Sequence, residues 1–128
     1  MTCSIGQTHR LPLKGKRILI ADDDAVARKA LTQELLAFGA TVLQASTAEE
    51  ALNQARSAIT VCVIDPQVRG RDAARLGQAL LEDCSPFVVH TYQAAEASRW
   101  SPMPLVLKPD HCGEVARTVL RLASSSPR

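Results

Sequence analysis

The chain has 128 residues, of which 46% are hydrophobic and 22% are charged, and its net charge is +2. This size and composition predict one globular domain with its own core. So small a net charge gives no reason to expect nucleic acid or a membrane surface as a partner, and no apolar stretch reaches the roughly 20 residues that a spanning helix needs. The opening residues lack the apolar centre of a signal peptide, so we expect a cytoplasmic location.

Residues 1–15 show no hydrophobic periodicity and contain two glycines and a proline, which predicts a flexible N-terminal tail. The folded domain is expected to span residues 16–123, and residues 124–128 to form a frayed C-terminus. The four cysteines are far apart and form no C-x-x-C pair, so we expect them to be reduced, buried and inert.

The first predicted element is a buried strand at residues 17–21, RILIA, followed by Asp22, Asp23 and Asp24. Three adjacent carboxylates repel one another, so the cluster needs a cation or a functional reason to lie at a strand end. The next helix presents apolar residues at spacings of three and four; Asp24 is placed to cap its start, and Gly39 to end it in the left-handed conformation.

A second strand is predicted at residues 41–45. Ser46 with Glu49 resembles a capping box for a helix that runs to about Ser57. A third strand follows at residues 61–64, VCVI, whose unbroken apolar run is typical of a strand buried on both faces.

Asp65 ends this third strand, because the following proline cannot donate to a sheet ladder. In open α/β sheets, ligands bind at the carboxyl ends of the strands. We therefore expect Asp65 to be the chemical centre of the protein. The remaining predicted elements are a helix at about 72–83, a strand at 86–91, a weakly helical segment at 92–100, a short strand at 105–107 and a helix from about 110 to 123.

Strands and helices thus alternate along the chain, which predicts a doubly wound parallel α/β sheet. The simplest topology is the flavodoxin-like one, with five strands in the order 2-1-3-4-5 and a short or irregular fourth helix.

Four of the five predicted strands end in a polar residue that could take part in chemistry, and parallel strands bring these ends to one edge of the sheet. Carboxylates are ligands that Mg²⁺ prefers, lysine is a point charge suited to a phosphoryl oxygen, and threonine can donate a hydrogen bond. The set fits phosphoryl transfer, in which positioning and charge neutralisation dominate. Its members are Asp22 and Asp23, Asp65, Thr91, and Lys108.

In these motifs, at these strand ends and in this order, the chain resembles the receiver domain of two-component response regulators from residue 16 to residue 122. The resemblance implies that Asp65 accepts a phosphoryl group from a phosphohistidine of a histidine kinase. It implies that Asp23, Asp65 and the backbone carbonyl of Gln67 bind Mg²⁺, with Asp22 acting through water. Lys108 would contact the phosphoryl group, and Thr91 would move to bond it. Phosphorylation would then change binding to a downstream protein, with no separate substrate turned over.

A narrower likeness concerns residues 65–71, DPQVRGR, and residues 86–91, PFVVHT. They resemble the D-V-N-L-G-G-E loop and the P-F-x-F-A-T strand of one receiver subgroup, whose members are mostly single-domain regulators partnered with histidine kinases of the HWE and related classes. Val89 and His90 depart from that motif. His90 is expected to be a half-buried strand residue with its hydrogen bonds satisfied.

Three other departures concern the surroundings of the acceptor. Leu105 stands where many receivers have a switch Tyr or Phe, and Asp110 replaces the usual Phe after Lys-Pro. Tyr92 is bulky where Ala or Gly is common, and its ring could shield the phosphoryl group from water. These changes leave the acceptor chemistry intact and affect the output surface.

Two alternatives stay open at this stage. Asp22-x-Asp24-x-Val26 also fits the D-x-D-x-[TV] motif of haloacid-dehalogenase-type phosphatases, with Asp22 as nucleophile, Asp24 as acid, and Thr91 and Lys108 as later motifs. Against it, Asp65 would have no role. The other alternative is a pseudo-receiver that is never phosphorylated and acts only as an interaction module.

Overall fold

The computed structural model describes residues 11–68, 73–110 and 112–125. The described elements alternate between strand and helix along the whole chain. The strands are β1 (Arg17–Ala21), β2 (Thr41–Ala45), β3 (Val61–Ile64), β4 (Phe87–Thr91) and β5 (Leu105–Leu107), and the helices are α2 (Ala25–Ala37), α3 (Ala48–Gln54), α4 (Ala73–Glu82), α5 (Glu96–Trp100) and α6 (Glu114–Ser124).

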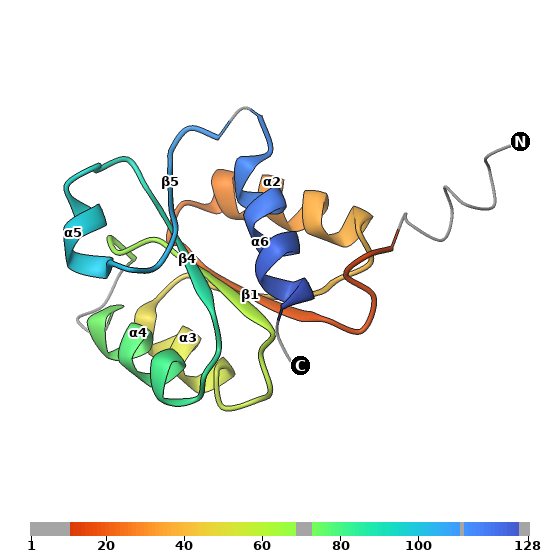
Figure 1. Cartoon of the computed structure of the whole chain (residues 1–128), viewed down its shortest axis with the longest axis horizontal. Helices are drawn as coiled ribbons and strands as arrows, with labels where there is room; N and C mark the ends of the chain where they lie inside the picture. The colour runs from red at the N-terminus through yellow and green to blue at the C-terminus, as the bar shows by residue number, and fades with distance from the viewer. Residues whose placement is uncertain (1–10, 69–72, 111, 126–128) are drawn as a thin grey trace, which may run out of the picture.

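The five strands form one parallel sheet in the order β2-β1-β3-β4-β5, as the sequence predicts (Figure 1). Helices α2 and α6 cover one face of the sheet, and α3 and α4 cover the other. This is the flavodoxin-like doubly wound fold. None of the helices in the described ranges has the length and apolar character needed to cross a bilayer.

The two covered faces explain why β3 is apolar at every position and β1 at every position after Arg17. Ile18 and Ile20 of β1 enter the core beneath α2 and α6, whereas Leu19 and Ala21 enter the core beneath α3 and α4. Successive side chains of a strand point to opposite faces, so a strand between two helical layers buries all of them. Strand β3 alternates in the same way, and its four residues are all buried.

The folded core extends further toward the N-terminus than the sequence indicates. Leu13 is 0% exposed and packs into the core beneath α2 and α6, and its N–H donates to the carbonyl of Phe38. The prediction of a flexible tail over residues 1–15 is therefore wrong at Leu13. Residues 1–10 lie outside the described part of the chain. A single apolar residue among turn residues gives no periodicity from which this anchor could be predicted.

Two helix starts differ from the prediction. The cap of α3 is Thr47, whose Oγ1 accepts from the N–H of Glu50, and the Glu50 carboxylate in turn accepts from the N–H of Ser46. The capping pair is therefore displaced by one residue from the predicted Ser46 and Glu49. Helix α6 begins at Glu114, because Asp110 accepts from the N–H groups of Glu114 and Val115 instead of entering the helix.

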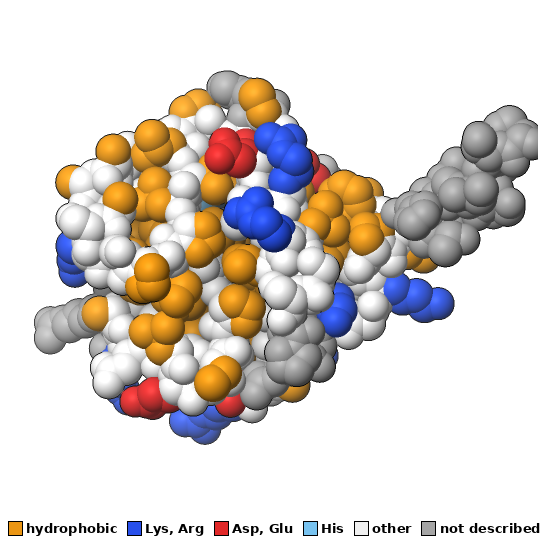
Figure 2. Space-filling view, viewed as in Figure 1, with side chains coloured by type: hydrophobic (Ala, Val, Ile, Leu, Met, Phe, Trp, Pro, Cys, Tyr) orange, Lys and Arg blue, Asp and Glu red, His pale blue; other side chains and the backbone are white. Residues whose placement is uncertain are grey.

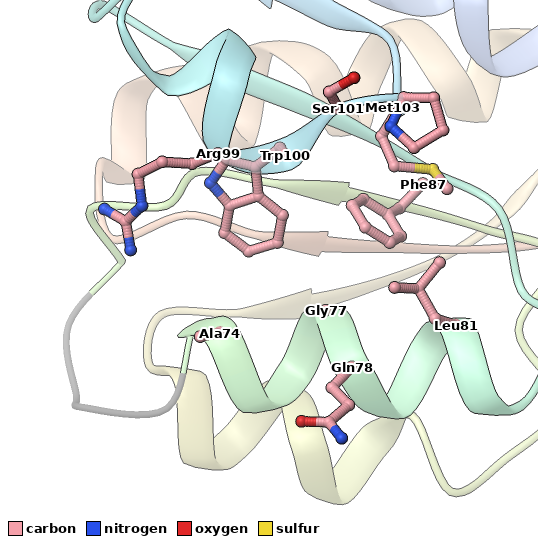
Figure 3. A pocket seen from close by; sticks show the side chains of 10 residues that line it. Ala74, Gly77, Gln78, Leu81, Phe87, Arg99, Trp100, Ser101 and Met103 are labelled. Atoms are coloured by element: carbon pink, nitrogen blue, oxygen red, sulfur yellow. The ribbon is translucent and has the colours of Figure 1, made fainter.

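The fourth helical segment is short, as expected: α5 has 5 residues. Trp100, at its end, packs edge-on against Phe87 of β4, with the ring centroids 5.8 Å apart, and donates its indole N–H to Glu96. Gly77 of α4 lies against the same indole, because a Cβ added at this glycine would lie 2.4 Å from Trp100 (Figure 3). A glycine inside a helix costs stability, and here its missing side chain makes room for the indole.

The expectation of buried cysteines is correct for Cys62 and wrong for two others. Cys62 lies in β3 with no exposed surface, and burial raises the pKa of its thiol. Cys84 and Cys112 are exposed, because both lie in turns that lead out of one element and into the next.

Candidate phosphoacceptor site

The carboxyl ends of β1, β3 and β5 extend their sheet hydrogen bonds by one residue, and this fixes the backbone of the site. The N–H of Asp22 donates to Ala45, that of Asp65 to Ala21, and that of Lys108 to Thr91. The predicted residues therefore meet at one edge of the sheet although they are far apart in the sequence. A short apolar strand followed by a polar residue is the feature that places each one there.

Lys108 joins the two buried carboxylates of the site. Its Nζ lies 2.8 Å from Oδ2 of Asp22 and 2.7 Å from Oδ2 of Asp65. All three residues are buried, with Lys108 8% and Asp65 6% exposed. Burial lowers the pKa of Lys108, but its hydrogen bonds to Asp22 and Asp65 and their charges raise it by more, so the pKa lies above its ordinary value. The lysine is a buried ammonium ion held between two acids.

Asp23 completes a cluster of acids with the same two residues. One carboxylate oxygen from each of Asp22, Asp23 and Asp65 lies within 4.8 Å of the others. Asp23 is exposed, whereas the other two are buried, so the cluster opens to solvent on the Asp23 side. Hard oxygen donors at this spacing suit Mg²⁺.

Gln67 lies in the turn directly after Asp65, where the resemblance expects it. Its N–H donates to Oδ1 of Asp65 at 2.8 Å, while Lys108 bonds the other oxygen. The two hydrogen bonds fix the plane of the Asp65 carboxylate.

Thr91, the last residue of β4, and Tyr92, which follows it, form another side of the site. Thr91 is fully buried, and its Oγ1 accepts from the N–H of Gln93 at 3.1 Å. The ring of Tyr92 lies over Lys108, with the ammonium 5.4 Å from the ring centroid, and is largely exposed. A cavity of about 270 Å³ opens above Asp65 between these residues. It is lined by Asp23, Asp24, Asp65, Gln67, Thr91, Tyr92, Gln93 and Lys108.

Asp24 lies beside the acidic cluster but has a structural partner. Its Oδ1 accepts from the N–H groups of Val26 and Ala27, so it caps α2, as predicted. Asp22 likewise uses one oxygen for Lys108 and the other for the N–H of Asp24. The phosphatase alternative needs Asp22 as a free nucleophile and Asp24 as a free acid, and the observed hydrogen bonds do not favour either role.

Two residues near the site were missed or misjudged from the sequence. Arg28 of α2 donates from Nη1 to the carbonyl of Asp22 at 2.7 Å and from Nε to the side chain of Gln44. No motif signals this role, because an arginine on a helix surface is ordinary. His90 is more buried than expected, 8% exposed, and its Nε2 has no hydrogen-bond partner among the described residues. The expectation of a satisfied histidine is therefore wrong.

Away from the acids, an apolar groove lies between α4 and the segment around α5. Figure 2 shows apolar side chains gathering on this face, and Figure 3 shows Phe87, Trp100, Met103 and Leu81 around the hollow. Its volume is about 230 Å³.

Comparisons with known proteins support the fold. No protein-family model matches the chain, and no curated protein sequence does. Solved structures do match: the non-phosphorylated receiver domain of HemR from Leptospira biflexa has a TM-score of 0.76 at 24% identity, covering 88% of this chain and 98% of that one. The response regulator TrrA from Thermotoga maritima, in complex with Mg²⁺ and BeF, has a TM-score of 0.74 at 23% identity, covering 84% and 98%.

The chemotaxis response regulator CheY4 of Vibrio cholerae is similar to the same degree, with a TM-score of 0.72 at 20% identity and coverage of 84% and 98%. At these identities the likeness establishes that this chain has the fold of receiver domains.

Proposed function

We propose that this protein is a phosphoacceptor of a two-component signalling system, which takes a phosphoryl group onto Asp65 and signals by a change in protein binding. The observation that carries the proposal is the environment of Asp65. Its carboxylate lies within hydrogen-bond distance of the Lys108 ammonium, within 4.8 Å of two further acids, and beneath an open cavity. A structural ion pair would need only the lysine and one acid.

The chemical step is the attack of a carboxylate oxygen of Asp65 on the phosphorus of a phosphohistidine. The P–N bond breaks, its electron pair leaves with the imidazole, and the imidazole takes up a proton. Lys108 supports the step because its ammonium can neutralise charge on the transferred group, which is the main form of catalysis in phosphoryl transfer. Thr91 lines the same cavity and has a hydroxyl that could donate to a phosphoryl oxygen.

Mg²⁺ is the cofactor that this donor set fits. Asp23 and Asp65 would hold it, together with the carbonyl of Gln67 and with Asp22 acting through water, as the resemblance implies. When bound, Mg²⁺ neutralises charge on the phosphoryl oxygens. In this proposal Lys108 prevents the buried acids from repelling one another before the ion arrives.

The signal would be carried by the loop after β4. The hydroxyl of Thr91 accepts a hydrogen bond from the N–H of Gln93. If this hydroxyl turned toward a phosphoryl group on Asp65, the loop that leads to α5 would lose that hydrogen bond. Shifting the populations of two conformational states of this surface from 1:99 to 99:1 requires about 5.5 kcal/mol. Two to four charge-assisted hydrogen bonds, at about 1.5–3 kcal/mol each, could supply this energy.

The finer parts of the proposal rest on the motifs in the sequence. The loop at 65–71 and the strand at 86–91 favour the PFxFAT subgroup and a histidine kinase of the HWE or a related class as donor. A cytoplasmic location follows from that partner. We expect no turnover of a separate substrate, and the downstream protein has no signature in the sequence.

Incubation with acetyl phosphate and Mg²⁺ tests the proposal. We expect the wild-type chain to gain one phosphoryl group by intact mass, and Asp65→Asn to gain none. Asp83→Asn is the matched control, since Asp83 is exposed and lies at the end of α4, away from the cavity. Removal of Mg²⁺ with a chelator should abolish labelling of the wild type and the control alike.

Equal labelling of Asp65→Asn would show that another residue accepts the group. An unlabelled wild type that also fails to bind beryllofluoride with Mg²⁺ would favour the pseudo-receiver alternative instead.

A further inference from the structure

Tyr92 lies over the buried ammonium of Lys108, and the function proposed above does not use this contact. The distance from Nζ to the centroid of the ring is 5.4 Å, inside the limit of about 6 Å for a cation–π interaction. Burial lowers the pKa of Lys108, but its hydrogen bonds to Asp22 and Asp65 and their charges raise it by more. The group beneath the ring is therefore a cation, which the face of an aromatic ring attracts.

The ring is the part of Tyr92 that has a partner. The residue is 66% exposed, so it contributes little to the core. Its hydroxyl makes no hydrogen bond within the described ranges. Tyr92 and Lys108 both line the cavity above Asp65 and a second cavity of about 330 Å³ beside α2. The side chain of Lys108 is nevertheless only 3% exposed, and the ring lies where it covers the ammonium between the two cavities.

The hydrogen bonds of Lys108 indicate what the ring adds. An ammonium has three N–H donors, and Nζ uses two of them, for Oδ2 of Asp22 and for Oδ2 of Asp65. When Asp65 takes up the phosphoryl group, its carboxylate loses its negative charge, and in the proposed function Lys108 then bonds a phosphoryl oxygen. During this exchange Asp22 is the carboxylate that still holds the lysine, and its pull draws the flexible side chain away from Asp65.

An aromatic ring opposes that pull without interfering with the transfer. It attracts the ammonium through its face and carries no formal charge. Unlike a third carboxylate, it therefore does not compete with the phosphoryl oxygens for the N–H donors of Lys108.

We propose that Tyr92 is a positioning residue for phosphoryl transfer: the face of its ring holds the ammonium of Lys108 beside Asp65 while the lysine exchanges its hydrogen bond to that carboxylate for one to the phosphoryl group. This inference rests on the proposed function of Asp65. It differs from a role as a shield, in which the ring only keeps water away from the phosphoryl group. Loss of a positioning residue slows the transfer, whereas loss of a shield speeds hydrolysis and does not slow the transfer.

Two substitutions of Tyr92 separate the aromatic face from the bulk of the side chain. Tyr92→Phe keeps the ring and removes only the hydroxyl. Tyr92→Leu removes the aromatic face and is smaller than tyrosine, so it cannot obstruct the phosphodonor. Leu36→Ala is the control, because Leu36 is an exposed apolar residue in the last turn of α2, at the end of that helix remote from Asp24.

The first measurement needs neither Mg²⁺ nor a phosphodonor. The ring current of Tyr92 should move the NMR shifts of the Lys108 protons next to Nζ upfield from those of the exposed Lys29. We expect this upfield shift in the wild type, in Tyr92→Phe and in Leu36→Ala, and its loss in Tyr92→Leu. Equal Lys108 shifts in Tyr92→Leu and the wild type would show that the ring does not hold the ammonium, and would overturn the proposal.

The second measurement is the rate of labelling by acetyl phosphate with Mg²⁺, over a range of donor concentrations. We expect Tyr92→Leu to lower the maximal rate about two- to fivefold, as for the loss of one exposed cation–π contact, with the donor concentration for half-maximal rate unchanged. Tyr92→Phe and Leu36→Ala should label at the wild-type rate. After removal of the donor, Tyr92→Leu should not lose the phosphoryl group faster than the wild type.

The outcomes separate this inference from the function on which it rests. A labelled wild type with an equal rate in Tyr92→Leu, or an equal loss of rate in Tyr92→Phe, would overturn the role of the ring and leave Asp65 as the acceptor. Faster hydrolysis as the only change in Tyr92→Leu would identify a shield and also overturn it. A wild type that is never labelled would instead overturn the proposed function, and this inference with it.

Discussion

The Nζ atom of Lys108 lies 2.7 Å from Oδ2 of Asp65, although the two residues are 43 positions apart in the chain. Each follows a parallel strand by one residue, so the sheet brings them together without any sequence motif that contains both. The same ammonium lies 2.8 Å from Asp22. The lysine thus has two roles: it stabilises the folded state, and in the proposed function it contacts the transferred group.

Lys108→Met should reveal the structural role. The variant leaves two buried carboxylates without their cation, and removal of one partner from a buried pair costs about 3–5 kcal/mol. We expect a loss of that size in the free energy of unfolding, measured in urea without divalent ions, and a partial recovery when Mg²⁺ is added. Lys29→Met, on the exposed side of α2, should change it little. A loss for Lys108→Met no larger than that of this control would show that the pair does not support the fold.

Thr91→Val should separate phosphorylation from its consequence. Valine has the shape of threonine without the hydroxyl, so Asp65 should still be labelled by acetyl phosphate. The loop from Tyr92 to α5 should no longer respond, because the hydroxyl that links it to the site is gone. Amide NMR shifts of residues 92–100, recorded with and without beryllofluoride and Mg²⁺, measure this response. Thr91→Ser keeps the hydroxyl, so its loop shifts should still change when beryllofluoride and Mg²⁺ are added. Loop shifts that do not change in this variant would contradict the assigned role of the hydroxyl.

The cap of α6 should depend on pH through Asp110. Burial raises the pKa of this carboxyl, but hydrogen bonds from the N–H groups of Val115 and Glu114 lower it by more, so the folded-state pKa lies below 3.8. The carboxylate therefore contributes stability at pH values above 3.8, and this contribution is lost as the pH falls through the folded-state pKa.

Asp110→Ala should thus lower the free energy of unfolding by about 0.5–2 kcal/mol at pH 7 and by progressively less below pH 3.8. Asp110→Asn cannot titrate, so its difference from the alanine variant should not vary with pH. Urea unfolding of the three proteins between pH 7 and pH 3 measures the effect. A difference between wild type and Asp110→Ala that stays constant over this range would rule out the charged cap.

Gly77→Ala should displace Trp100. The added Cβ would lie 2.4 Å from the indole, so the ring must leave its place against Phe87. Overpacking costs about 1–3 kcal/mol, which outweighs the gain of about 1 kcal/mol from replacing a helical glycine. We expect a small net loss of stability and a red shift of Trp100 fluorescence. Gln78→Ala, at the neighbouring exposed position, is the control and should leave the emission of Trp100 unchanged. Unchanged emission in Gly77→Ala would show that the position of the indole does not depend on the glycine.

The strands and their order could be predicted because every strand leaves a strong local signal. Strand β3 is short, apolar throughout and closed by Asp65 and Pro66, and this pattern fits one environment, a strand between two helical layers. The convergence of Asp22, Asp65, Thr91 and Lys108 then follows from the topology. Their meeting is confirmed by the structure; the roles assigned to them stay predictions.

The features that could not be predicted depend on contacts between distant residues. Leu13 is an anchor only because α2 ends where it can receive that side chain. Among the described residues the Nε2 of His90 has no hydrogen-bond partner, which depends on the side chains that pack around it, and the sequence around His90 does not contain this information. The sequence predicts the start of α6 too early, because Asp110 can either begin a helix or cap it from outside, and local propensity does not distinguish these cases.

The most direct test of the central claim is to locate the phosphoryl group after treatment with acetyl phosphate and Mg²⁺. Reduction with borohydride converts an aspartyl phosphate to homoserine, and peptide mass spectrometry then identifies the modified position. We predict homoserine at position 65 in the wild-type protein. Modification at Asp22, or a phosphoryl group recovered on a histidine, would contradict the account.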